Sequence, residues 1–231
     1  MNTPDAFLFD MDGLLLDSER VYLEQAVALL SPTGRDPEHT RAFFRTMTGT
    51  SGARALHKLT GFFGCADHAA SFNADWHAAV RAALELNVVP KPTVRETLEA
   101  LSQAGHRMGV VTSTHGDRAR QHLENTGLLG FFEHVRGGNE VSATKPHPAP
   151  YLEMAATLGI APARCAAFED SDPGITAAVT AGCRSAQVPD VRAPDVPLPD
   201  LGQHVASDLW SAVAHFGGLG GAKLPFIKTG G

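Results

Sequence analysis

The chain has 231 residues, of which 43% are hydrophobic, so it can bury a sizeable core as one domain or as one domain with an insertion. Its formal net charge of -6 and its lack of basic runs exclude a large nucleic-acid-binding surface. No segment reaches the length of a membrane span, and Asp5, Asp10 and Asp12 interrupt the N-terminal apolar run, so we expect no membrane association. The three cysteines form no Cys-x-x-Cys pair, which indicates free thiols in a reducing compartment and predicts a cytoplasmic protein.

The first predicted strand spans residues 6–10 and is followed by a long helical stretch. From about residue 19 to residue 86 the apolar spacing is helical, and no segment has the pattern of a strand. We therefore expect an α-helical cap domain, residues 17–87, inserted into a catalytic core made of residues 1–16 and 88–231.

The remainder of the chain alternates between short apolar segments and helical patterns. Four further strands are expected at residues 107–113, 164–170, 184–190 and 204–207. Helices are expected at residues 93–105, 116–127, 148–160 and 173–182, and each of the first, second and fourth ends at a glycine. This alternation predicts an α/β fold with a Rossmann-like, doubly wound parallel sheet.

Residues with reactive or phosphate-binding side chains follow three of these strands or lie in a loop that can reach the same edge of the sheet: Asp10, Asp12, Thr112, Ser113, Lys145, Glu169 and Asp170. Ligands of open α/β sheets bind outside the carboxyl ends of the strands, so we expect one shared site. Carboxylates gathered there repel one another unless a cation compensates, and hard oxygen ligands suit Mg²⁺. Hydroxyl groups and a lysine suit a phosphate group. The set predicts phosphoryl transfer through an aspartyl-phosphate.

Four segments, in this order, resemble the four motifs of the haloacid dehalogenase superfamily: "DMDGLLLDSE" from Asp10, "GVVTST" from Gly109, "KPHPAPY" from Lys145 and "FEDSDPGITAAVTAG" from Phe168. The helical insert lies where the first cap type of this family belongs. The resemblance spans residues 10–182 and implies a magnesium-dependent enzyme whose cap closes over the site, excludes water and chooses the substrate.

The resemblance also implies a role for each candidate residue. Asp10 would be the nucleophile that attacks phosphorus, and Asp12 would be the general acid and base. The phosphoryl group would be held by Thr112, Ser113 and Lys145. The Mg²⁺ ion would be held by the carboxylates of Asp10 and Asp170, the backbone carbonyl of Asp12 and, directly or through another ligand, Glu169.

The acid at Asp12 favours enzymes that act on phosphate esters, because the dehalogenases of the superfamily lack an acid at this position. We expect a phosphatase of small phosphorylated metabolites, with sugar phosphates as the favoured class. The alternatives are a phosphosugar mutase of the β-phosphoglucomutase type and a non-catalytic module that binds phosphorylated metabolites. Gly52 stands where we place the cap arginine of the mutases, and the nearest arginine is Arg54, which weakens the mutase alternative. The oligomeric state, monomer or small homo-oligomer, is left open.

Three further positions stand out from the resemblance. Thr93 occupies a place where relatives usually have glycine, and we expect a local change of the turn. Asp172 adds a negative charge near the metal site, and the sequence offers no account of it. Thr114 is expected to be a local helix cap.

Overall fold

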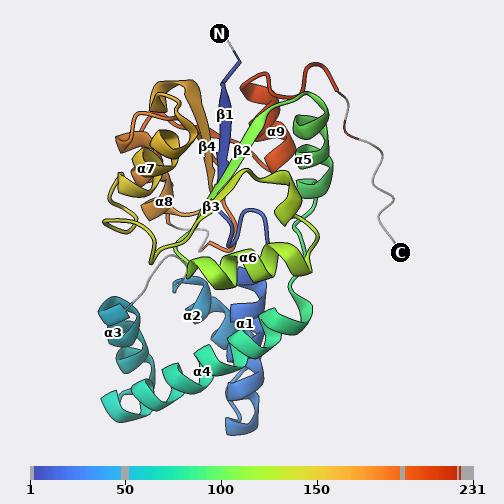
Figure 1. Ribbon diagram of the computed structural model, residues 1–231. Coiled ribbons are helices and arrows are strands. Elements are labelled where there is room, and N and C mark those ends of the chain that lie inside the picture. The colour runs from blue at the N-terminus through green and yellow to red at the C-terminus, as the bar shows by residue number, and fades with distance from the viewer. Residues whose placement is uncertain (1–2, 48–51, 193–195, 223, 225–231) are drawn as a thin grey trace. The chain divides into compact units, whose positions relative to one another are not determined.

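The computed structural model describes residues 3–47, 52–192, 196–222 and 224, and it is shown in Figure 1. Part of the loop on which the mutase comparison depends, residues 48–51, lies outside the described residues. The chain divides into two compact units. The first comprises Met1–Leu16, Pro90–Pro189 and Pro199–Gly231, and the second comprises Asp17–Val89 and Asp190–Leu198.

The described residues of the first unit form one six-stranded sheet in which every strand pair is parallel. In order across the sheet the strands are β3 (His134–Arg136), β2 (Arg107–Val111), β1 (Ala6–Phe9), β4 (Cys165–Glu169), β5 (Arg184–Gln187) and β6 (His204–Val205). This topology confirms the predicted doubly wound α/β fold and all five expected strands. The edge strand β3 was missed because its three residues carry no apolar run.

Helices cover both faces of this sheet, with α7 and α8 on one side and α5 and α9 on the other (Figure 1). The helices of the unit are α5 (Val94–Gln103), α6 (Gly116–Asn125), α7 (Ala149–Leu158), α8 (Asp172–Thr180) and α9 (Leu209–His215). Short 3₁₀ turns are present at Leu129–Phe131 and Pro162–Arg164.

The central strands are held by different packing on their two faces. Leu8 of β1 belongs to a buried cluster with Tyr151 and Met154 of α7. On the opposite face, Phe168 of β4 stacks on Phe9 with ring centroids 5.1 Å apart. Successive strand residues point to opposite faces, so this double packing fixes β1 and β4 relative to each other. The carboxyl ends of the two strands are therefore a rigid platform.

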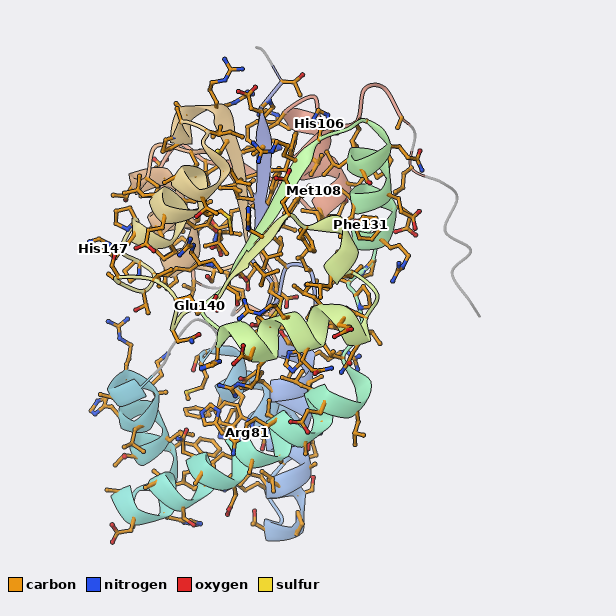
Figure 2. All side chains as sticks on the ribbon, viewed as in Figure 1. Arg81, His106, Met108, Phe131, Glu140 and His147 are labelled. Carbon is orange, nitrogen blue, oxygen red and sulfur yellow. The ribbon has the colours of Figure 1, made fainter. Side chains whose placement is uncertain are left out.

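Figure 2 shows His106 and Met108 at the start of β2. The ring of His106 packs against Phe7 with centroids 4.9 Å apart. Thr112 follows the other end of the same strand, beyond Val111. Thr112 therefore lies at the carboxyl end of β2, and His106 lies at the opposite end of the same strand.

The regular structure of the second unit is helical throughout its described residues. Its helices are α1 (Ser18–Leu30), α2 (Pro37–Arg45), α3 (Gly52–Phe63) and α4 (Ala66–Asn87), with a 3₁₀ turn at Ser31–Thr33. Phe44, Leu59 and Trp76 lie in its buried core. The indole N–H of Trp76 donates to the carbonyl of Tyr22 at 2.8 Å, which satisfies a polar group that the core would otherwise leave unpaired. None of the described helices combines the length and the hydropathy needed to cross a lipid bilayer.

Thr93, directly before α5, is the one described residue other than glycine with a positive φ, at 68°. A β-branched side chain is strained in this left-handed conformation, which glycine adopts freely. The hydroxyl of Thr93 is buried without a hydrogen-bond partner, so no side-chain bond offsets the strain. The departure from glycine therefore has a conformational cost.

We expect Thr93→Gly to raise the free energy of unfolding by about 1 kcal/mol. The left-handed conformation costs threonine more than the additional conformational entropy that glycine loses on folding. Urea denaturation followed by circular dichroism measures the change. Thr97→Gly, inside α5 with ordinary helical geometry, should lower the same free energy. A destabilised Thr93→Gly variant would contradict the strain argument.

Candidate active site

Asp10 follows β1 and lies buried at the edge of the sheet, with 6% of its surface exposed. Its backbone N–H donates to the carbonyl of Phe168 at 3.0 Å, which continues the pairing of β1 with β4 beyond the strand. Its carboxylate accepts a hydrogen bond from the ammonium of Lys145, with Nζ 2.5 Å from Oδ1. Residues 135 positions apart in the chain thus form a buried ion pair.

The same ammonium contacts a second buried carboxylate. Lys145 Nζ lies 2.6 Å from Oε1 of Glu169, at the end of β4, and it also donates to the carbonyl of Val111 at 2.8 Å. These three contacts use all three donors of the ammonium. The side chain of Lys145 is 5% exposed, so its position is fixed by these partners rather than by solvent.

Glu169 is fully buried and is oriented from two further sides. The phenol of Tyr151 in α7 donates to Oε1 at 2.5 Å. On the other side the backbone of Gly174 leaves room for the carboxylate, because a Cβ at this glycine would lie 1.9 Å from Oε2. Glycine is therefore required at this point in the first turns of α8.

Figure 2 labels Glu140 and His147 in the loop that carries Lys145. Glu140 accepts from Arg120 Nη2 at 2.6 Å and from the backbone N–H of Gly137 at 2.8 Å. At the other end of the loop, Nδ1 of His147 accepts from the N–H of Ala149 at 3.1 Å. The loop is thus anchored on both sides of the lysine, which limits the entropy lost when Lys145 is held in place.

Asp170 completes a group of three buried carboxylates that can share one cation. One carboxylate oxygen from each of Asp10, Glu169 and Asp170 lies within 4.8 Å of the others. Lys145 supplies one positive charge to Asp10 and Glu169, which together carry two negative charges when ionised. Burial raises the pKa of Asp10 well above its usual range, Glu169 raises it further, and the attraction of Lys145 opposes the increase. A site made only of hard oxygen ligands and short of positive charge fits Mg²⁺.

The effect of these carboxylates extends to their neighbours. They raise the pKa of Lys145 despite the burial of its ammonium, so the lysine is charged at neutral pH. Burial, followed by the charge of Glu169, raises the pKa of Tyr151 well above its ordinary value, so its hydroxyl keeps the proton that it donates. Both donors are therefore fixed in the protonation state that the contacts require.

Asp12 is partly exposed and lies beside the end of β2. The hydroxyl of Thr114 donates to its Oδ2 at 2.7 Å, and the hydroxyl of Thr112 lies 3.5 Å from the same oxygen. Thr112 also accepts from the N–H of Thr114 at 3.1 Å. Gly13, with φ of 79°, turns the chain sharply after Asp12. The Asp12 carboxylate is thus held by the hydroxyls of the turn that follows β2, and it is not one of the three carboxylates of the shared group.

The structure therefore brings most of the predicted residues into two adjoining groups. The first group consists of Asp10, Lys145, Glu169 and Asp170, and the second consists of Asp12 and Thr112. Ser113 lies in the same turn with an exposed side chain. The part of Asp12 expected to bind Mg²⁺ is its backbone carbonyl, and this remains a prediction.

Two contacts in the site go beyond the residues selected from the sequence. The expectation that Thr114 caps a helix is wrong: His115 occupies the position before α6, and the Thr114 hydroxyl binds Asp12. The second contact joins Tyr151 to Glu169. Tyr151 is the last residue of "KPHPAPY", and its place in that segment was the only signal of its role in the sequence.

Comparison with known proteins agrees with this geometry. The model of the family described as haloacid dehalogenase-like hydrolase matches residues 7–188. The phosphorylated carbohydrates phosphatase of Thermotoga maritima is 29% identical over 178 residues, which cover 77% of this chain and 82% of that protein.

Two solved structures share the fold over nearly the whole chain. A HAD family hydrolase from Deinococcus radiodurans, solved with bound phosphate and sodium, is 28% identical with a TM-score of 0.74 and covers 96% of this chain and 100% of its own. A putative beta-phosphoglucomutase from Thermotoga maritima is 25% identical, with a TM-score of 0.70. The match covers 92% of this chain and 98% of that protein. The family match, the sheet topology and the convergence of the motif residues lead to one conclusion: the chain belongs to the haloacid dehalogenase-like hydrolases and is a phosphatase of that family.

Proposed function

We propose that the protein is a Mg²⁺-dependent phosphatase of a small phosphorylated metabolite, with sugar phosphates as the favoured class, and that it acts through an aspartyl-phosphate. The observation that carries the proposal is the buried contact of Lys145 with both Asp10 and Glu169, beside Asp170. A relative described as a phosphatase of phosphorylated carbohydrates supports the substrate class.

In the first step, a carboxylate oxygen of Asp10 attacks phosphorus while the bond from phosphorus to the ester oxygen breaks. Asp12 donates its proton to the departing oxygen, so the alcohol leaves neutral. The contact with Lys145 favours the ionised, nucleophilic form of Asp10 against the effect of burial. Thr112, Ser113 and Lys145 are proposed to hold the oxygens of the phosphoryl group.

In the second step, the ionised Asp12 takes a proton from water, and the resulting oxygen attacks phosphorus. The bond between phosphorus and Asp10 breaks, and phosphate and free carboxylate are released. Asp12 ends protonated, ready for the next ester. A Mg²⁺ ion held by Asp10, Asp170, Glu169 and the Asp12 carbonyl would neutralise the charge of the phosphoryl oxygens.

We further propose that residues 17–87 form the cap domain of a core made of residues 1–16 and 88–231. The separate helical core around Phe44, Leu59 and Trp76 supports this division. In this proposal the cap selects the substrate, and the sheet edge performs the chemistry.

A phosphate-release screen across sugar phosphates with Mg²⁺ should find at least one good substrate, and excess EDTA should abolish the release. Asp10→Asn should lower kcat by about a thousandfold or more, since an amide is not a nucleophile toward phosphorus. Acid quenching during turnover of a ³²P-labelled substrate should trap label on the wild-type protein alone.

The control is Asp200→Asn, an exposed aspartate of the first unit, which should leave kcat unchanged. Full activity of Asp10→Asn, or acid-stable label on that variant, would overturn the assignment of the nucleophile.

Thr114→Val should lower kcat about tenfold with KM within about twofold, because Asp12 loses the donor that holds its carboxylate. Thr114→Ser keeps the hydroxyl and should restore most of the activity. Steady-state kinetics on the best substrate of the screen measure both. If the valine and serine variants behave alike, the hydroxyl does not orient Asp12.

The mutase alternative is kept because a solved relative is described as a putative beta-phosphoglucomutase. The arginine that would serve it, Arg54, is exposed on α3. Incubation with a hexose 1-phosphate and a trace of the matching bisphosphate separates the two reactions. We expect free phosphate and no isomeric monophosphate by ³¹P NMR, and accumulation of the hexose 6-phosphate would favour the mutase.

A further inference from the structure

Gln187, the last residue of β5, is fully buried and pairs in register with Glu169 of β4. Its side-chain amide reaches the loop between β4 and α8. Nε2 lies 3.3 Å from the backbone carbonyl of Asp170 and 3.1 Å from Oδ1 of Asp172. One amide nitrogen thus bridges a main-chain oxygen of the proposed metal ligand and the carboxylate two residues further on.

The orientation of the Gln187 amide is set by its hydrogen bond with the side chain of Gln203. Oε1 of Gln187 accepts from Nε2 of Gln203 at 3.1 Å, and the same nitrogen of Gln203 donates to the carbonyl of Pro199 at 2.6 Å. The side-chain oxygen Oε1 of Gln203 accepts from the backbone N–H of Leu201 at 3.0 Å. Each amide therefore has its donors and its acceptor engaged, and a flip of either would set two like groups against each other. The chain of contacts presents N–H groups, and not an oxygen, to the loop.

The loop itself is short and is tied down on both sides of Asp170. The N–H of Val188 donates to the carbonyl of Glu169 at 2.7 Å, just before it. Just after it, Ser171 occupies the position before α8 and accepts from the N–H of Gly174 at 3.3 Å. The Gln187 amide adds two further contacts, one to Asp170 itself and one to Asp172 at the start of α8.

We propose that Gln187 and Asp172 form a clamp that positions the carboxylate of Asp170 for the divalent cation and so sets the affinity of the site for Mg²⁺. The clamp rests on the proposed function, whose metal site it deepens. Its charge balance follows from the residue types: an amide holds the Asp172 carboxylate without adding a positive charge that would compete with the cation. Asp172, for which the sequence offered no account, is thereby given a role. Neither residue is proposed to touch the substrate, so both are positioning residues.

The test is the dissociation constant for Mg²⁺, measured by isothermal titration calorimetry on the whole protein without substrate. Gln187→Met, which keeps the volume of the side chain, and Asp172→Ala should each raise the constant about tenfold, the effect of losing a residue that supports a metal ligand. Gln187→Met removes both contacts of the amide, and Asp172→Ala removes one of the same two. The double variant should therefore bind Mg²⁺ no more weakly than Gln187→Met alone. Asp172→Asn keeps an acceptor oxygen for Gln187 and should recover most of the loss.

Two controls separate failure of the clamp from failure of the metal site. Gln121→Met, an exposed glutamine on α6, should bind Mg²⁺ as the wild type does. Asp170→Asn should lose most of the binding, and if it does not, the metal site of the proposed function is wrong. Circular dichroism melting curves identify variants that are unfolded, and Asp172→Ala, partly exposed, replaces Gln187→Met if that variant does not fold.

Unchanged affinity in both Gln187→Met and Asp172→Ala, with Asp170→Asn impaired, would overturn the clamp and leave the proposed function standing. Equal losses in Asp172→Asn and Asp172→Ala would also overturn it, since the charge of Asp172 and not its contact with Gln187 would then matter. Additive losses in the double variant would have the same meaning.

Discussion

The ion pair that Lys145 makes with Asp10 and Glu169 is the contact on which the site depends. Removing charged groups from water is costly, and the cost is recovered only when each charge has close partners. Here the three N–H groups of one ammonium contact two carboxylates and a backbone carbonyl. Removing the lysine would leave Asp10 and Glu169 facing each other in a buried space. The lysine therefore holds the two carboxylates of the candidate site in place.

This contact is possible because the sheet brings distant segments to one edge. Asp10 directly follows β1, and Glu169 is the last residue of the neighbouring parallel strand β4. The stacked rings of Phe9 and Phe168 add side-chain packing to the backbone pairing of these two strands. Lys145 comes from a loop that is anchored separately at Glu140 and His147. A rigid platform with an anchored loop is suited to a reaction whose acceleration comes from positioning and electrostatics.

The site is also supported by residues that carry no charge at neutral pH. Tyr151, Gly174 and Gln187 each constrain a carboxylate or its backbone: the phenol donates, the glycine leaves space, and the amide ties the loop. Among the described residues other than glycine, the left-handed backbone conformation is found at Thr93, just before α5 begins. The buried carboxylates of the candidate site thus have close polar partners, while the connection before α5 carries a conformational cost.

The sequence by itself determined the fold class, the order of the central elements and the chemical types gathered at the sheet edge. Short apolar runs ending in Asp10 and Glu169 are local signals, and a chain that alternates strands and helices has few ways to bury both faces of its strands. The edge strand β3 was not predicted, because its three exposed or partly exposed residues form no apolar run. Only the tertiary structure decided that Thr114 binds Asp12, that Tyr151 binds Glu169 and that Gln187 holds Asp172. These contacts join residues from 15 to 102 positions apart, and their partners are set by the register of the strands and the packing of α7, which no local pattern encodes.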